Sequence, residues 1–316
     1  MARVLVTRRL PEGGLDPLVH AGHTVIQRAE DDRYEPEELV ALAPDVDGIL
    51  CLLTDRIDEP VLRAGAAGRL RVVGTAAVGF DNIDLVVAGA IGIAVCNTPG
   101  VLDKTTADLA FLLILASSRL ASEAERDLRA GHWGGWGFMD YLARDIHGGV
   151  LGLVGYGRIA REVARRAEGF DMEVIHHSRT KTGHPGYVSD LDDLLATADV
   201  VSLHVPLTEA TRHLIGAREL ALMKPTAVLV NTARGPVVDE DALVDALESA
   251  SLFAVGLDVY DGEPEINPRL LAAPRTVLLP HVGSSTTETR TRMAQLAAQG
   301  ICDVLAGNTP PNLVSA

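Results

Sequence analysis

Three side chains suited to proton transfer and anion binding each follow a strand-like apolar run late in the sequence: Arg234, Glu263 and His281. The carboxyl ends of strands line the ligand crevice of an open α/β sheet, so these side chains are expected to converge although they are far apart in sequence. Arginine can bind a carboxylate and polarise a neighbouring carbonyl oxygen. Histidine can protonate that oxygen, and a glutamate on its other ring nitrogen would favour the imidazolium. Taken singly, each also fits a structural role: a helix cap, a turn residue and a loop closure.

A glycine loop precedes these residues. The apolar run 150–154 leads into Gly155-Tyr156-Gly157-Arg158-Ile159-Ala160 and then into a helical stretch that ends near Gly169. This is a GxGxxA pattern between a strand and a helix, the context that a dinucleotide site requires. Gly155 allows the tight turn, Gly157 lets the backbone approach a pyrophosphate at the helix N-terminus, and Ala160 keeps the helix close to the strand.

The residues that follow the next strand-like run, 172–176, indicate which dinucleotide binds. An NAD site usually has an acidic residue at the end of this strand for the ribose hydroxyls. Here the chain instead continues His177-Ser178-Arg179-Thr180-Lys181, with no carboxylate. A guanidinium offers paired donors and charge to a 2′-phosphate, so NADP(H) is favoured and NAD(H) stays open. A solvated basic turn is the structural alternative.

No metal is expected. His176 and His177 are adjacent on a strand and therefore point to opposite faces, so they cannot share one ion. No other histidine, cysteine or carboxylate cluster has ligand spacing.

The elements that must position these residues alternate between strand-like runs and helical stretches along the whole chain, which is typical of α/β layering around parallel sheets. A turn-rich segment, 97–100, separates two series of runs and leads into a predicted helix over 105–120. We expect two parallel-sheet α/β domains, Rossmann-like or flavodoxin-like, with the active site in the cleft between them. The predicted runs are 4–7, 24–26, 48–53, 70–75 and 93–96, then 150–154, 172–176, 200–205, 227–231, 254–259 and 277–279.

The last thirty residues hold a predicted helix over about 288–305 and an extended tail that ends Asn312-Leu313-Val314. They are too few to form a third domain and must pack on one of the two others.

The composition narrows the classes of function that the protein can have. The 316 residues are 47% hydrophobic and 22% charged with a net charge of −15, which argues against coating a nucleic acid. The three cysteines are far apart with no CxxC pair, as in a reducing compartment. The first residues lack a signal-peptide pattern, and the apolar stretch 109–116 is too short to span a membrane. A cytoplasmic protein is expected.

Several segments, in order along the chain, resemble the D-isomer-specific 2-hydroxyacid dehydrogenases, especially the glyoxylate/hydroxypyruvate reductase branch. Besides the glycine loop and Ser178-Arg179-Thr180, they are Ala77-Val78-Gly79-Phe80-Asp81-Asn82-Ile83-Asp84, Asn97-Thr98-Pro99, Thr106-Ala107-Asp108-Leu109-Ala110-Phe111, Asn231-Thr232-Ala233-Arg234-Gly235, Leu257-Asp258-Val259, Glu263-Pro264 and Pro280-His281-Val282-Gly283-Ser284.

The resemblance implies a discontinuous substrate domain, 1–98 plus 286–316, and a cofactor domain, 99–285. It implies that Arg234, Glu263 and His281 are the catalytic residues. The backbone amides of Val78 and Gly79 would hold the substrate carboxylate, with Leu53 on the opposing loop. The implied cofactor-binding residues are Thr106, Gly155, Tyr156, Gly157, Arg158, Ile159, Ser178, Arg179, Thr180, His204, Val205, Pro206, Thr232, Ala233, Asp258, His281 and Gly283.

The resemblance also implies a homodimer, formed through the 105–120 helix and the loop after it, and the nearly all-round apolar character of that helix agrees with this. Two features depart from the family pattern. Ala160 replaces the usual third glycine, and only Trp133 and Trp136 remain of a Trp-rich loop that reaches the partner's active site in the reductase branch. Ordinary interface packing is the alternative for these two tryptophans.

The favoured function is an NADPH-linked reductase of a small 2-oxo acid such as glyoxylate or hydroxypyruvate, acting without nucleic acid or membrane. The first alternative is an NAD-linked enzyme of the phosphoglycerate dehydrogenase type, which Ser178 and Arg179 disfavour. The second is a dinucleotide-sensing corepressor that resembles the C-terminal binding proteins, for which no docking tail is seen. A Schiff-base enzyme fits poorly, because none of the three lysines ends a strand-like run.

Overall fold

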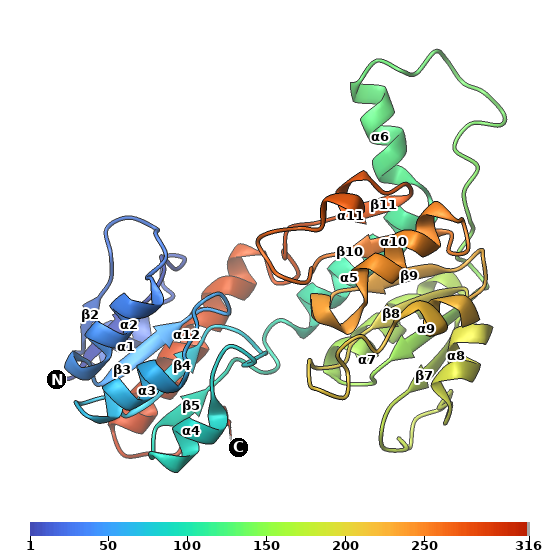
Figure 1. Cartoon of the computed structure of the whole chain (residues 1–316). Helices are drawn as coiled ribbons and strands as arrows, with labels where there is room; N and C mark the ends of the chain where they lie inside the picture. Colours follow the sequence, from blue (N-terminus) through green and yellow to red (C-terminus); the bar gives the residue numbers. More distant parts are fainter. Residues whose placement is uncertain (315–316) are drawn as a thin grey trace. The chain divides into compact units, whose positions relative to one another are not determined.

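The computed structural model describes residues 1–314 and divides into two compact units (Figure 1). Unit 1 contains residues 1–102 and the segment from Ser284 onward, and unit 2 contains residues 103–283. Each unit is built around a six-stranded sheet covered by helices on both faces, so the predicted fold class, two parallel-sheet α/β domains, is confirmed.

The sheet of unit 1 has the strand order β12-β5-β4-β3-β1-β2 and is parallel except for β12. Its central strands are apolar and buried on both faces, as expected for strands between two helical layers. Its elements are β1 (Arg3–Val6), α1 (Asp16–His20), β2 (Thr24–Ile26), α2 (Pro36–Leu42), η1 (Ala43–Asp45), β3 (Gly48–Cys51), α3 (Glu59–Ala66), β4 (Val72–Thr75), α4 (Leu85–Ala90), β5 (Ala94–Cys96), α12 (Thr287–Leu305) and β12 (Leu313–Val314).

The C-terminal segment belongs to unit 1. Helix α12 begins at the capping residue Thr286, whose side chain accepts a hydrogen bond from Thr289 N–H, and it packs on β3, β4 and β5. The tail then pairs antiparallel with β5, Leu313 opposite Cys96. The sequence predicted the helix and the extended tail but left open which domain they cover.

The sheet of unit 2 is entirely parallel, in the order β11-β10-β9-β8-β6-β7. Its elements are α5 (Asp103–Ser118), α6 (Ala121–Arg129), β6 (Val150–Val154), α7 (Arg158–Ala167), η2 (Glu168–Phe170), β7 (Glu173–His177), α8 (Leu191–Thr197), β8 (Val200–Leu203), α9 (Ala217–Leu222), β9 (Val228–Asn231), η3 (Gly235–Val237), α10 (Glu240–Glu248), β10 (Ala254–Leu257), α11 (Pro268–Ala272) and β11 (Thr276–Leu278).

The two faces of this second sheet carry separate apolar cores. Helices α5 and α7 pack against each other on one face, and α8, α9, α10 and α11 contribute to the core on the other. Most apolar residues of α5 are buried in this way, although Leu112 is 52% exposed. The apolarity of the helix is therefore largely explained within unit 2, and by itself it does not require a partner.

Several predicted boundaries were wrong by about two residues. The runs 48–53, 200–205 and 254–259 extend beyond β3, β8 and β10, because the apolar pattern continues into the loops that follow these strands. The predicted 105–120 helix is α5, which ends at Ser118, and Leu120 then adopts the left-handed conformation (φ 51°) that separates it from α6.

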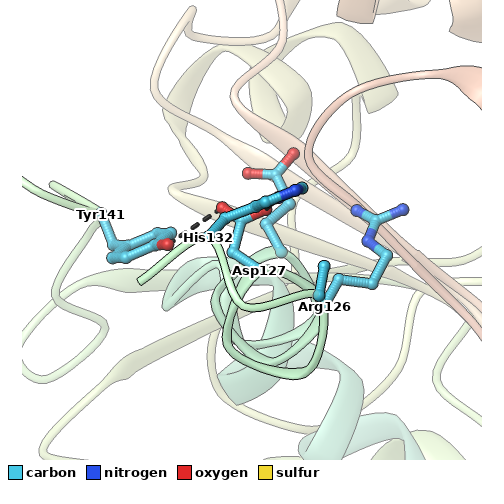
Figure 2. Close-up of a pocket in the computed structure, with 6 residues that line it drawn as sticks. Arg126, Asp127, His132 and Tyr141 are labelled. Atoms are coloured by element: carbon cyan, nitrogen blue, oxygen red, sulfur yellow. Dashed lines mark hydrogen bonds and ion pairs between the residues drawn. The ribbon is translucent and has the colours of Figure 1, made fainter. Parts of the chain in front are cut away.

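Helix α6 and the loop after it form an arm, residues 121–145, whose first turn contacts the edge of the sheet at β11 and whose remainder stands away from the sheet of unit 2 (Figure 1). The base of the loop is tied back to the helix, since the Tyr141 hydroxyl donates to the Asp127 carboxylate at 2.9 Å (Figure 2). Beside this bond lies a hollow of about 410 Å³, lined by Glu123, Arg126, Asp127, Ala130, His132 and Tyr141. The arm exposes large apolar side chains, namely Leu128, Trp133, Trp136, Phe138, Met139 and Leu142.

No single helix among residues 1–314 is long and apolar enough to cross a membrane. The pair α5 and α6 passes that test only together, across a bend of 69°.

Candidate active site

The loops after the adjacent strands β10 and β11 bring an acid–base pair together in unit 2. His281 Nδ1 lies 2.8 Å from Glu263 Oε2, and both side chains are partly exposed, at 26% and 29%. The other carboxylate oxygen, Oε1, accepts a hydrogen bond from Tyr260 N–H at 2.9 Å. The carboxylate is thereby fixed, and Nε2 is the ring nitrogen of His281 that Glu263 does not hold.

The pKa of Glu263 reflects this arrangement. Burial raises the pKa of this carboxyl, but the hydrogen bond and charge of His281, the N–H of Tyr260 and the charge of Arg234 together outweigh burial and hold it below its ordinary value. Glu263 is therefore ionised at neutral pH. An anion at this place stabilises a positive charge on His281.

Arg234 follows β9, the strand next to β10, and its turn is fixed by the side chain of Asn231. Asn231 Nδ2 donates to Arg234 O at 2.8 Å, and Asn231 Oδ1 accepts from Ala233 N–H at 2.9 Å. The guanidinium donates from Nη1 to Ala233 O at 2.8 Å. Gly235 then passes so close to the next loop that a Cβ atom there would lie 1.8 Å from the carbonyl carbon of Tyr260.

The loop that carries His281 is held by two buried groups on the β10 side. Asp258 is 1% exposed, and its two oxygens accept from Val282 N–H at 2.7 Å and Gly283 N–H at 2.8 Å. The Tyr260 hydroxyl donates to Leu279 O at 2.8 Å. His281 itself has a φ of 54°, an uncommon conformation for a residue with a side chain, and these contacts maintain it.

The glycine loop lies at the end of β6 and has the geometry that a dinucleotide needs. Gly155 has a φ of +88°, and a Cβ there would meet His204 O at 2.7 Å, so only glycine fits. Gly157 is the N-cap of α7, with open space where a Cβ would be and no side-chain cap on the helix. The first amides of α7 thus remain available to an anion. Ala160 is fully buried against the core, which explains why a small residue is required.

Further groups fit a dinucleotide at this edge of the sheet. Thr232 Oγ1 is buried and has no hydrogen-bond partner among residues 1–314, an arrangement that a bound ligand would satisfy. A Cβ on Gly283 would lie 3.5 Å from the side chain of Thr106, which places the His281 loop beside the start of α5. Arg158 pairs with Asp103 at 3.3 Å, and Ile159 packs into the core.

Two more predicted segments end the strands that flank β6. Ser178, Arg179 and Thr180 follow β7 and are half-buried to exposed, with Ser178 Oγ donating to Thr180 O at 2.8 Å. His204, Val205 and Pro206 follow β8. Burial lowers the pKa of His204 to about 4, so its ring is neutral when it bonds Ser202 Oγ at 2.9 Å.

The residues expected to bind a substrate carboxylate lie in unit 1, in loops at the ends of β3 and β4. Asn97 Nδ2 donates to Val78 O at 2.8 Å and so fixes the turn that contains Gly79. Asn82 Nδ2 donates to Leu52 O at 3.0 Å, which orders the loop that bears Leu53, itself 37% exposed.

Sequence reasoning did not identify the residues that hold the site in place: Tyr260, Asn231, Asn82 and Asn97. Each lies inside or beside a motif singled out for another residue. For Asn231 and Asn97 the signal that could have found them is a polar side chain at a strand end, where backbone groups lose their sheet partners, whereas Tyr260 and Asn82 lie further along their loops.

Comparisons with known proteins place the chain in a family. The family model for the D-isomer specific 2-hydroxyacid dehydrogenase, NAD binding domain, matches residues 111–283. The glyoxylate reductase of Thermococcus litoralis is 42% identical, with 99% of this chain and 96% of that protein covered. The solved glyoxylate reductase from Paecilomyes thermophila has a TM-score of 0.88 at 36% identity, covering 99% of this chain and 98% of that chain. The NADPH-dependent glyoxylate/hydroxypyruvate reductase of Sinorhizobium meliloti, solved with NADP and malonate, has a TM-score of 0.86 at 32% identity, covering 99% and 96%.

The matched family segment contains the glycine loop and the strand ends that carry Arg234, Glu263 and His281. Similarity over nearly the full length adds unit 1 to the match. With a site suited to a dinucleotide beside an ionised glutamate–histidine pair, the chain is an NAD(P)-dependent oxidoreductase that belongs to the D-isomer specific 2-hydroxyacid dehydrogenase family, in its glyoxylate reductase branch.

Proposed function

We propose that this protein reduces a small 2-oxo acid of the glyoxylate or hydroxypyruvate type to the D-2-hydroxy acid, with NADPH as the preferred reductant. The observation that carries the proposal is the hydrogen bond between His281 and the ionised Glu263, formed where the strand next to Arg234 ends. The names of the relatives, glyoxylate reductase and glyoxylate/hydroxypyruvate reductase, support the substrate class.

The roles of the side chains follow from their chemistry. When bound, the dihydronicotinamide supplies a hydride to the carbonyl carbon of the substrate. Arg234 binds the carboxylate and polarises the carbonyl oxygen, where negative charge develops. His281 donates the proton on Nε2 to that oxygen. Glu263 orients the ring through Nδ1 and stabilises the positive charge of its protonated form.

The remaining contacts are proposed from the resemblance to the family. The Val78 and Gly79 amides bind the substrate carboxylate, with Leu53 on the loop after β3. The cofactor pyrophosphate would bind at Gly155 and Gly157, and the other predicted cofactor residues would hold the remaining parts of the dinucleotide: Thr106, Tyr156, Arg158, Ile159, His204, Val205, Pro206, Thr232, Ala233, Asp258 and Gly283.

The preference for NADPH rests on the turn after β7. It contains Arg179 and Lys181 and no carboxylate, so it offers charge and paired donors to a 2′-phosphate. The S. meliloti relative was solved with NADP, which agrees with this proposal.

Initial rates with NADPH and with NADH, each against glyoxylate, hydroxypyruvate and pyruvate, test the proposal. We expect rapid turnover with NADPH and with glyoxylate or hydroxypyruvate. Tight cofactor binding without turnover of any of the three would contradict the proposed substrate class and favour either a bulkier 2-oxo acid or a dinucleotide sensor. Faster turnover with NADH would contradict the cofactor preference alone.

We also propose a homodimer formed through the α5–α6 region of unit 2 and a cytoplasmic location. The arm exposes Trp136, Phe138 and Met139 at 81%, 79% and 71%, and clustered exposed apolar residues mark interaction surfaces. All three cysteines are unpaired and buried, which fits a reducing compartment.

A further inference from the structure

A buried histidine on β7 has no part in the mechanism above. The His176 side chain is completely buried, and its Nε2 lies 2.6 Å from Thr182 Oγ1. Its ring stacks on that of Tyr156, the second residue of the glycine loop, with centroids 3.7 Å apart and an angle of 18°. One imidazole therefore contacts both the glycine loop and the segment that follows the Ser178 turn.

The chain after this turn returns along the outer edge of β7. His176 N–H donates to Gly186 O at 2.8 Å, and Val188 N–H donates to His176 O at 2.8 Å. Tyr187 forms a bridge opposite His176 and packs its ring against the imidazole edge, at 5.8 Å between centroids. The turn over residues 178–181 is thus anchored by β7 at one end and by Thr182 at the other.

The protonation state of His176 gives its bond to Thr182 a direction. Burial lowers the pKa of His176, and the nearby His184 and His177 act in the same direction, so the ring is neutral at pH 7. Nδ1 is buried with no partner among residues 1–314. A buried N–H without an acceptor is rarer than an unused acceptor, so we place the proton on Nε2, which donates to Thr182 Oγ1.

We propose that His176 is a positioning residue for cofactor discrimination, which holds the Ser178–Lys181 turn through Thr182 and ties this turn to the glycine loop through Tyr156. The inference rests on the proposed recognition of the 2′-phosphate by that turn. If His176 is only a packing residue, its hydrogen bond to Thr182 has no influence on the choice between NADPH and NADH.

The side chain of Thr182 is partly exposed, which allows a test that leaves the core intact. The variants are Thr182→Val, which removes the hydroxyl at constant shape, and Thr182→Ser, which keeps it. Dissociation constants of NADPH and NADH are measured by calorimetry without a 2-oxo acid. Thr182→Val removes the bond with His176 and also a longer one, 3.4 Å, that the same oxygen accepts from His184 N–H. We expect it to weaken NADPH about threefold to tenfold and NADH less than about twofold. Thr182→Ser should bind both as the wild type does.

A second variant connects the effect to the imidazole. His176→Phe keeps an aromatic ring on Tyr156 and removes Nε2. If the two residues act through one hydrogen bond, the double variant His176→Phe/Thr182→Val weakens NADPH no more than either single variant. Thermal unfolding without cofactor shows whether His176→Phe is folded. If it is not, the comparison of Thr182→Val with Thr182→Ser tests the proposal.

The outcomes separate this inference from the proposed function. Equal weakening of both cofactors, no weakening, or equal behaviour of the Val and Ser variants overturns the role of His176. A wild-type protein that prefers NADH contradicts the proposed cofactor preference. Even then, the role of His176 as a positioning residue is supported if the dissociation constant of NADPH rises relative to that of NADH in Thr182→Val and not in Thr182→Ser.

Discussion

In the proposed mechanism, Glu263 acts through a single charge next to His281. The lowered pKa of this carboxyl keeps it ionised at neutral pH, and the proposed reduction needs a protonated imidazole. Glu263→Gln keeps the shape of the side chain and removes its charge, so the imidazolium of His281 is less favoured. As pH rises, the variant should therefore lose reductase activity at a lower pH than the wild type does. We expect the alkaline limb of the kcat/KM profile to move to lower pH. At pH 7 we expect a loss on the order of tenfold, equivalent to about 1.4 kcal/mol of transition-state stabilisation.

The matched control is Glu265→Gln, an exposed carboxylate two residues further along the chain. Its profile should coincide with that of the wild type. A Glu263→Gln profile with an unmoved alkaline limb would contradict the proposed pairing in catalysis. The acid limb of the wild-type profile also reports on Glu263. Because the pKa of this carboxyl is lowered, it loses its charge only as pH falls below the usual range for glutamate.

Arg179 is the residue on which the proposed preference for NADPH depends most directly. It is exposed in the turn after β7, where a 2′-phosphate would add a charge-assisted hydrogen bond. Arg179→Ala should weaken NADPH by about 1–3 kcal/mol and NADH much less. Binding titrations of both cofactors measure this, with Arg179→Lys as the variant that keeps the charge but loses the paired donors. Equal losses for NADPH and NADH would exclude recognition of the phosphate by Arg179.

At the scale of the element, the loop after β11 is held in part by one carboxylate, Asp258, which directly follows the neighbouring strand β10. Asp258 accepts two backbone N–H groups with its two oxygens, and an asparagine amide offers only one acceptor. Asp258→Asn should therefore leave one buried N–H unpaired, at a cost of about 1–3 kcal/mol. For a unit of this size that lowers Tm by roughly 2–4 °C per kcal/mol, and kcat should fall because His281 is held less firmly.

Thermal unfolding and initial rates measure these two effects. Asp261→Asn is the control, because Asp261 is an exposed carboxylate three residues away. Unchanged Tm and kcat in Asp258→Asn would show that the loop keeps its conformation without the carboxylate.

This loop also shows how far the sequence carries a prediction. Apolar runs followed by reactive residues were enough to place Arg234, Glu263 and His281 at the ends of three strands, and the structure confirms that those strands are adjacent. The positive φ of His281 and the hydroxyl contact of Tyr260 were not predictable, because both depend on how two loops pack against each other. The pairing of residues 186–188 with β7 was not predictable either, because these residues follow a turn and have no strand pattern.

At the scale of the whole molecule, the arm after α5 is the feature that its own unit leaves most exposed. Trp136 and Phe138 contact each other edge to face, with ring centroids 6.1 Å apart, yet both are about four-fifths exposed. A pair of large aromatic rings in water is costly at roughly 25 cal/mol per Å² of apolar surface, and a second copy of the chain would cover it. We therefore expect the wild-type protein to have about twice the mass of one chain in light scattering after size exclusion.

Trp136→Glu combined with Phe138→Glu should convert this dimer into a monomer, or weaken it at least about a hundredfold, because two charges would be buried without partners. Val86→Glu is the control, since Val86 is a comparably exposed apolar side chain, at 75%, on α4 of unit 1.

A wild-type protein that is monomeric at micromolar concentration would contradict the proposed dimer. If the double variant stays dimeric, the interface lies elsewhere, and the exposed face of α5 around Leu112 becomes the next surface to test in the same way. Activity measured on the monomeric variant then shows whether the arm only joins the two copies: an unchanged kcat with an unchanged KM means that each chain has a complete site of its own.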